Sequence, residues 1–199
     1  MVYGAKKWDN PDTYYSQENN PTEAFLKATV EERAGWLESC GPTAAVNCLA
    51  AMGVHLDIVC PGDYRPQPEE VLMDFFNDPR NRDELEEIRN LDITIPENRV
   101  PQFYPYAVMQ VFGVSARFEW GVSWGELVSY LKSGHSVQVC LKSPGHYIAV
   151  VAYDSDEDVM LYNDPWGSRF ADGKGGWHRR LFKQAVAGNL QEYLIVYGQ

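Results

Sequence analysis

A long apolar segment is the first feature that the sequence lacks. A membrane-spanning helix needs about 20 consecutive apolar residues, and no run in these 199 residues approaches that length. The first ten residues, MVYGAKKWDN, also lack the apolar segment of a secretory signal. We therefore expect no membrane span and synthesis in the cytoplasm, with export by another route left open.

Basic side chains are also scarce. The chain has 17 Lys and Arg against 28 Asp and Glu, a formal net charge of −11. Nucleic acids and anionic membrane surfaces are bound by clusters of Lys and Arg. The charge balance therefore argues against either of them as a partner.

Cysteine is scarce too, and its spacing fits neither a metal site nor a disulfide framework. The four thiols show no C-x-x-C pair and no Cys/His spacing of a structural zinc site. Cys40 and Cys48 lie about 12 Å apart along one predicted helix, too far to bridge. We expect four free thiols, no metal and no cofactor, with structural roles for Cys48, Cys60 and Cys140.

The apolar content is that of a globular protein, at 45% hydrophobic and 13% aromatic residues. The length predicts one domain, residues 1–199. Helical spacing predicts helices at 22–37, 40–53, 69–77, 82–91, 102–112 and 123–134. Strand patterns occur at 114–120, 136–142, 146–154, 159–163, 177–182 and 192–197. The order predicts an α+β fold, with a helical N-terminal half packed on a C-terminal, mostly antiparallel sheet.

Cys40 occupies the first turn of a helix that is apolar on nearly every face. Pro42 suits a first turn, and Gly53 provides an end. A thiol in this position lies among unpaired N–H groups at the positive end of the helix dipole, which favours the nucleophilic thiolate. The alternative is a small apolar residue that begins a core helix, as most buried free cysteines are.

Of the four histidines, His146 is the one that opens the most apolar strand. Asp164 closes the next strand, and the turn Asp154–Asp158 joins the two strands as a hairpin. Outer ends of a hairpin are neighbours, with cross-strand side chains about 5 Å apart. Asp164 would then orient His146 and leave the other ring nitrogen for Cys40. A hydrogen-bonded strand end and a strand-ending turn remain the structural alternatives.

These segments resemble the C39-like branch of the papain-like cysteine peptidases. That branch includes the domains that remove double-glycine leaders from bacteriocin precursors, and stand-alone bacterial and phage proteins. The resemblance covers roughly residues 14–197. It rests on an upstream Gln followed by Cys40-Gly41-Pro42-Thr43, Gly145-His146-Tyr147 and Asn163-Asp164-Pro165-Trp166-Gly167, in that order.

The resemblance implies a papain-like fold and a site residue for each catalytic role. Cys40 would be the nucleophile, His146 the general base and acid, and Asp164 the orienting residue. The family's oxyanion-hole glutamine maps onto Gln17, in the short extended segment Tyr14–Gln17, with the Cys40 backbone N–H as second donor.

Gln17 departs from the family pattern in its spacing. It lies 23 residues before Cys40 rather than a few, so residues 22–37 would form an inserted helix that loops out and returns. Loop-closure entropy grows slowly with length, so such an insertion is physically tolerable. Ser39 or a backbone group is the alternative donor.

The implied activity is that of a thiol protease or related amide hydrolase that forms a thioester acyl-enzyme. The substrate would be a peptide, a protein or a cell-wall peptide. A papain-like acyltransferase of the transglutaminase type, and a non-catalytic binding module on the same fold, are the alternatives.

A glycine-rich segment, Asp172-Gly173-Lys174-Gly175-Gly176, lies close to Asp164 in the sequence. A loop is the simplest interpretation, and a lid over the cleft is a second one. Gly175-Gly176 also resembles a double-glycine cleavage sequence, although a loop explains the pair without it.

Overall fold

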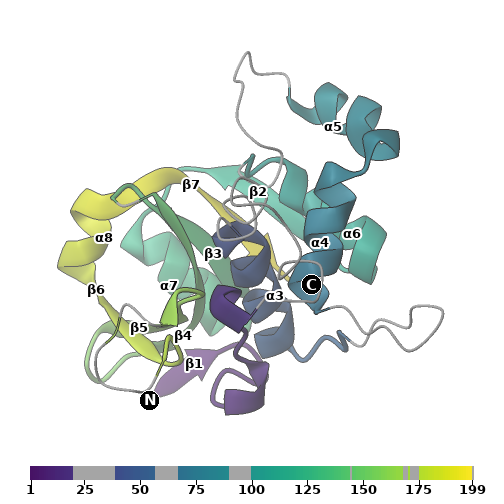
Figure 1. Cartoon of the computed structure of the whole chain (residues 1–199). Coiled ribbons are helices and arrows are strands. Elements are labelled where there is room, and N and C mark those ends of the chain that lie inside the picture. The colour runs from purple at the N-terminus through teal and green to yellow at the C-terminus, as the bar shows by residue number, and fades with distance from the viewer. Residues whose placement is uncertain are drawn as a thin grey trace.

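A computed structural model of the chain describes residues 1–19, 39–56, 67–89, 100–143, 145–167, 170 and 175–198 (Figure 1). Its α-helices are α3 (Cys40–Met52), α4 (Pro68–Asn77), α5 (Arg82–Arg89), α6 (Phe103–Phe112), α7 (Trp124–Lys132) and α8 (Lys183–Asn189). Its short 3-10 helices are η1 (Pro11–Thr13), η2 (Gln17–Asn19) and η3 (Pro79–Asn81). Its strands are β1 (Val2–Gly4), β2 (Ala116–Trp120), β3 (Ser136–Leu141), β4 (His146–Asp154), β5 (Val159–Asn163), β6 (Arg179–Phe182) and β7 (Leu190–Tyr197).

The strands form one sheet in the order β2-β7-β3-β4-β5-β6, and β1 pairs with β4 beside this path. Every pairing is antiparallel. β4 and β5 form the expected hairpin, with Asp154 opposite Val159 at its turn. The predicted mostly antiparallel sheet and the α+β class are confirmed.

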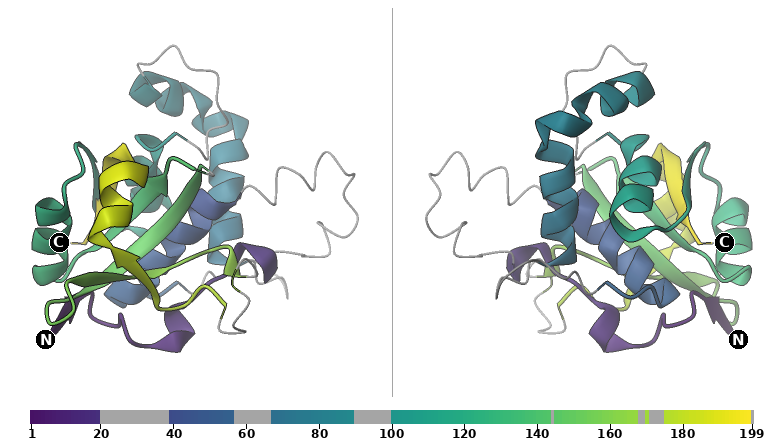
Figure 2. Two further views of the ribbon diagram at one scale, coloured as in Figure 1. Left: turned by 90° about the vertical axis from the view of Figure 1, so that its left-hand side faces the viewer. Right: turned by 90° about the vertical axis from the view of Figure 1, so that its right-hand side faces the viewer.

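Both faces of the sheet are covered by helices (Figure 2). Side chains alternate between the faces of a strand, so Ala149 and Val151 of β4 pack in one core with α3, α4 and α6. Ile148 and Val150 face the opposite way and pack with α7 and α8. The central strands are therefore buried on both sides, which explains why their sequences read as continuous apolar runs.

α3 is the helix around which the first core is built. Every residue from Gly41 to Ala51 is buried. Gly53 ends the helix with a φ of 83°, and its N–H bonds to the carbonyls of Ala50 and Leu49. This left-handed conformation is one that glycine adopts at little cost. The structure therefore starts the helix at Cys40 and ends it beside Gly53, as the sequence predicts.

Several details differ from the sequence-based expectations. β1 and α8 are not predicted by the sequence pattern. The strand expected at 177–182 is shorter, at Arg179–Phe182. Gln17, expected at the end of an extended segment, is instead the first residue of η2. The helical insertion expected at 22–37 and the turn around Cys60 lie outside the described residues.

Candidate active site

Cys40 is the first residue of α3 and its side chain is partly exposed. The N–H of Thr43 bonds to the carbonyl of Ser39 (2.9 Å) and closes the first turn. The thiol therefore lies at the N-terminus of a buried helix, where backbone N–H groups point toward it. Cys40 packs beside the buried cluster of Ala44, Cys140 and Tyr147.

β3 anchors α3 at both ends through polar side chains on a buried face. Ser136 Oγ donates to the carbonyl of Cys48 (2.9 Å). Gln138 Nε2 donates to the carbonyl of Gly41 (3.1 Å), and Gln138 Oε1 accepts from the Tyr197 hydroxyl (2.5 Å). The Gln138 bond fixes the first turn of the helix, next to Cys40. Gln138 is not among the site residues that the sequence predicts, although a glutamine inside an apolar strand is itself a signal of a specific polar contact.

The structure brings His146 and Asp164 into direct contact. His146 Nε2 lies 2.6 Å from Asp164 Oδ1, and the two side chains are 4% and 0% exposed. The same carboxylate oxygen accepts the N–H of Trp166 (2.9 Å). The Trp166 ring, which is 41% exposed, lies edge-on to the imidazole at 6.2 Å between centroids. The carboxylate is thus held by the turn that follows it and shielded from water together with the imidazole.

A β-bulge sets the register of the hairpin near Asp164. The register between β4 and β5 shifts by one residue between Val150 and Ala152, so the extra residue lies in β4. Below the shift Ala149 is opposite Asn163, the residue before Asp164. Without the bulge Asn163 would be opposite Val150, so the bulge determines which residues of β4 lie beside the end of β5.

The second ring nitrogen of His146 is left for Cys40. Burial lowers the pKa of His146, but hydrogen bonds with Asp164 and Cys40 and the charges of both outweigh burial and raise that pKa to about 9. Nε2 faces Asp164, so Nδ1 is the ring nitrogen left for Cys40. With its pKa raised to about 9, His146 is protonated at neutral pH.

The segment that contains Gln17 packs against the turn after Asp164. The N–H of Gln17 and the Ser16 hydroxyl both donate to the carbonyl of Pro165, at 3.0 and 3.2 Å. The Tyr14 hydroxyl donates to the backbone carbonyl of Asp164 (3.0 Å). Despite its distance in sequence from Cys40, Gln17 thus lies beside the turn that carries the candidate acid.

Gly176 is packed against Asp164 as part of the fold. Asp164 N–H donates to the carbonyl of Gly176 (2.8 Å), and Gly176 N–H donates to the Tyr14 hydroxyl (3.1 Å). A Cβ at position 176 would lie 1.8 Å from the Asp164 carbonyl oxygen. Close packing on the acid therefore explains Gly176 better than a cleavage sequence does. Residues 172–174 of the segment considered as a lid lie outside the described residues.

The other two described thiols and His178 lie in structural settings. Burial raises the pKa of the Cys48 thiol, and burial raises that of Cys140 to about 11, so both stay protonated. His178 is stacked between Trp8 and Trp177, and its Nε2 bonds to the Trp8 carbonyl (2.7 Å).

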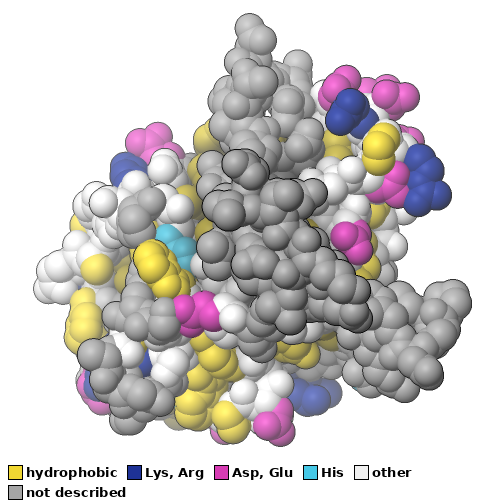
Figure 3. Space-filling view, in the orientation of Figure 1, with side chains coloured by type: hydrophobic (Ala, Val, Ile, Leu, Met, Phe, Trp, Pro, Cys, Tyr) yellow, Lys and Arg dark blue, Asp and Glu magenta, His cyan; other side chains and the backbone are white. Residues whose placement is uncertain are grey.

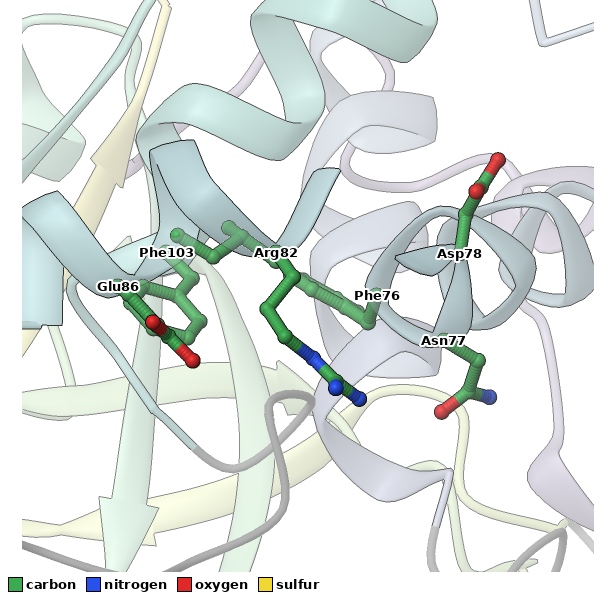
Figure 4. Close-up of a pocket in the computed structure, with 7 residues that line it drawn as sticks. Phe76, Asn77, Asp78, Arg82, Glu86 and Phe103 are labelled. Atoms are coloured by element: carbon green, nitrogen blue, oxygen red, sulfur yellow. The ribbon is translucent and has the colours of Figure 1, made fainter. Parts of the chain in front are cut away.

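A separate pocket lies between α4, α5 and α6, with a volume of about 80 Å³. Phe76, Leu85 and Phe103 contribute apolar surface, and the Arg82 side chain extends between Glu86 and Phe76 (Figure 4). Charged side chains gather over α5 on this part of the surface (Figure 3). None of the described residues that line the pocket is a Cys, Ser, Thr or His.

In the described ranges, no group of three His, Cys, Asp or Glu side chains is placed to bind a metal ion. None of the helices in those ranges is long and apolar enough to cross a membrane.

Comparisons with known proteins address the family directly. A model of the "Peptidase_C39 like family" matches residues 13–185. No curated protein shows a significant sequence match.

Two solved structures show low similarity to the chain. One is a double glycine motif protease from an AMS/PCAT transporter in complex with the leader peptide, at 14% identity and a TM-score of 0.45 over 80% of this chain and 84% of that one. The other is UfSP from C. elegans, at 12% identity and a TM-score of 0.40 over 98% of this chain and 34% of that one.

The family model alone carries the assignment, because it spans most of the sequence and contains Cys40, His146 and Asp164. The resemblance inferred from the motifs is confirmed, and the chain belongs to the Peptidase C39-like family.

Proposed function

We propose that this protein is a cysteine peptidase that acts through Cys40, His146 and Asp164. The observation that carries the proposal is the buried imidazole of His146, bound at Nε2 to Asp164 (2.6 Å), with Cys40 among the groups that raise its pKa. A nucleophile, a base and an orienting group are the three parts that nucleophilic catalysis needs. Membership of a peptidase family supports the same activity.

In the proposed reaction the Cys40 thiolate attacks a peptide carbonyl carbon. The S–C bond forms, and the negative charge moves to the carbonyl oxygen. The C–N bond then breaks, and the imidazolium of His146 gives its proton to the leaving amine. Because the pKa of His146 is raised to about 9, this proton is present at neutral pH. Asp164 keeps the ring oriented and stabilises its charge.

Water completes the cycle. The neutral imidazole takes a proton from water as it attacks the thioester, and the carboxylic acid product leaves as the Cys40 thiolate and the imidazolium are restored. We propose the Cys40 backbone N–H and Gln17 as donors to the oxyanion in both steps, with Ser39 as the alternative to Gln17. The proposed substrate is a peptide or protein.

The direct test is peptide cleavage by matched cysteine variants. Wild type, Cys40→Ala and Cys48→Ala are incubated with a peptide library that includes double-glycine sequences, and products are identified by mass spectrometry. Cys48→Ala is the control because its thiol is buried on the same helix. We expect cleavage by wild type and Cys48→Ala and none by Cys40→Ala. Cleavage by Cys40→Ala at the wild-type rate would refute the proposal.

The same reactions separate the alternatives. Adding a primary amine gives amide-linked conjugates if the acyl group is transferred, and only carboxylic acid products if water is the acceptor. If wild type cleaves nothing but binds a library peptide as tightly as Cys40→Ala does, the fold serves as a binding module.

A further inference from the structure

Asn47 is a buried amide on α3 that the proposed chemistry leaves without a role. Its side chain is fully buried in a helix that is otherwise almost entirely apolar. It lies seven residues after Cys40, which at 3.6 residues per turn places both on nearly the same face of the helix. A buried polar side chain at such a position needs hydrogen-bond partners within the protein.

Those partners belong to the segment that precedes Gln17. Asn47 Oδ1 accepts the N–H of Tyr15 (2.9 Å), and Nδ2 donates to the Tyr15 carbonyl (2.9 Å). Nδ2 also donates to the Thr43 carbonyl (2.9 Å), one turn closer to Cys40. Both amide N–H groups and the amide oxygen are therefore used. The side chain pairs with Tyr15 as a neighbouring strand would, through one donated and one accepted bond.

The segment held in this way is fixed at its other end by the turn that follows Asp164. Two residues after Tyr15, the N–H of Gln17 bonds to the Pro165 carbonyl (3.0 Å). Asn47 and Cys40 are separated by about 10.5 Å along the helix axis at 1.5 Å per residue. Two extended residues cover up to about 7 Å, and the glutamine side chain extends further. Gln17 is thus tied to the nucleophile helix on one side and to the acid's turn on the other.

We infer that Asn47 is a positioning residue that sets Gln17 as an oxyanion donor relative to Cys40. The inference rests on the proposed peptidase function and on Gln17 as the donor. Removing an oxyanion donor costs about 100- to 1,000-fold in kcat. Asn47→Ala leaves the donor Gln17 in the chain but removes the bonds that hold its segment. We therefore expect kcat to fall by tenfold or more. Asn47 is not among the groups that raise or lower the pKa of His146, so we expect the alkylation of Cys40 to change little.

The test compares two reactions of Cys40, only one of which develops an oxyanion. Hydrolysis of p-nitrophenyl acetate passes through a tetrahedral oxyanion, whereas alkylation by iodoacetamide does not. Both rates are measured for wild type, Asn47→Ala, Gln17→Ala and the double variant, with the rate of Cys40→Ala subtracted. Ser136→Ala is the matched control, because it removes another buried hydrogen bond to α3 (2.9 Å, to the Cys48 carbonyl) away from Gln17. Thermal melts confirm folding, and Asn47→Asp replaces Asn47→Ala if the latter does not fold.

We expect Asn47→Ala to slow ester hydrolysis at least tenfold and alkylation less than about twofold, with Ser136→Ala unchanged in both. In the Gln17→Ala background Asn47→Ala should add less than about twofold, because it acts through Gln17. The inference would be overturned if Asn47→Ala slowed ester hydrolysis equally in the wild-type and Gln17→Ala backgrounds. It would also be overturned if Asn47→Ala slowed ester hydrolysis and alkylation equally. An unchanged ester rate in Gln17→Ala would overturn it too, whereas the peptidase proposal would stand as long as peptide cleavage still requires Cys40.

Discussion

His146 Nε2 lies 2.6 Å from Asp164 Oδ1, and both side chains are removed from water. A buried carboxylate next to an imidazole favours the imidazolium and fixes which ring nitrogen faces outward. The remaining nitrogen is left for Cys40, which is among the groups that raise the pKa of His146. One contact therefore determines both the charge and the orientation of the proposed base.

The first prediction concerns the alkaline limit of peptide cleavage. His146 has a pKa raised to about 9, so its proton for the leaving amine is present below that pH and lost above it. We expect kcat/KM for the peptide cleaved best in the library to fall above about pH 9. Asp164→Ala removes the hydrogen bond that raises the pKa, and the fall should begin at least one pH unit lower. The exposed Asp83→Ala on α5 is the control and should leave the limit unchanged; a limit unmoved by Asp164→Ala would contradict the assignment.

The second prediction concerns the glycine packed on the acid. Gly176→Ala would place a Cβ 1.8 Å from the Asp164 carbonyl oxygen, so the backbone on one side has to move. We expect the free energy of unfolding to fall by about 1–3 kcal/mol. The rate of peptide cleavage should fall with it. Gly188→Ala on α8 meets nothing within 4 Å and should be neutral or slightly stabilising. Urea unfolding of both variants measures the difference, and equal stabilities would count against the packing described here.

The third prediction concerns the hydroxyl that bridges the acid's turn and Gly176. Tyr14→Phe removes one bond to the Asp164 carbonyl (3.0 Å) and one from the Gly176 N–H (3.1 Å). Leaving these groups unpaired should lower the free energy of unfolding by about 1–3 kcal/mol. Tyr106→Phe serves as the control because its ring packs on Phe75 and that contact survives the change. Thermal melts of Tyr14→Phe and Tyr106→Phe at one pH measure the difference. A Tyr14→Phe melt identical to wild type would show that the hydroxyl bridge adds nothing to the free energy of unfolding.

The parts of the site that could be predicted are those set by local pattern. Pro42, the alanine-rich run and Gly53 mark a buried helix that starts at Cys40. Two apolar runs around an acidic turn mark the hairpin that brings His146 and Asp164 together. Periodicity and turn chemistry act over a few residues, so both features are visible in the sequence.

The parts that could not be predicted depend on contacts between distant segments. The register shift beside Val151 decides which residues of β4 lie opposite the end of β5, next to Asp164, yet no glycine or proline marks it. Asn47 and Gln138 are polar residues inside apolar elements, and their partners are 32 and 97 residues away. The role of each becomes visible only in the folded chain, where Tyr15 lies beside Asn47 and Gly41 lies beside Gln138.

The central proposal, that Cys40 is a nucleophile activated by His146, is tested most directly by alkylation across pH. An ordinary thiol with a pKa near 8.5 reacts with iodoacetamide about 80-fold more slowly at pH 6 than at pH 8, because its thiolate fraction falls. Mass spectrometry of the cysteine-containing peptides follows Cys40, with free cysteine as the reference and His146→Ala as the matched variant. We predict that Cys40 in wild type slows by less than about threefold over this range and that His146→Ala restores the large decline. A decline for wild-type Cys40 that parallels free cysteine would contradict the proposal.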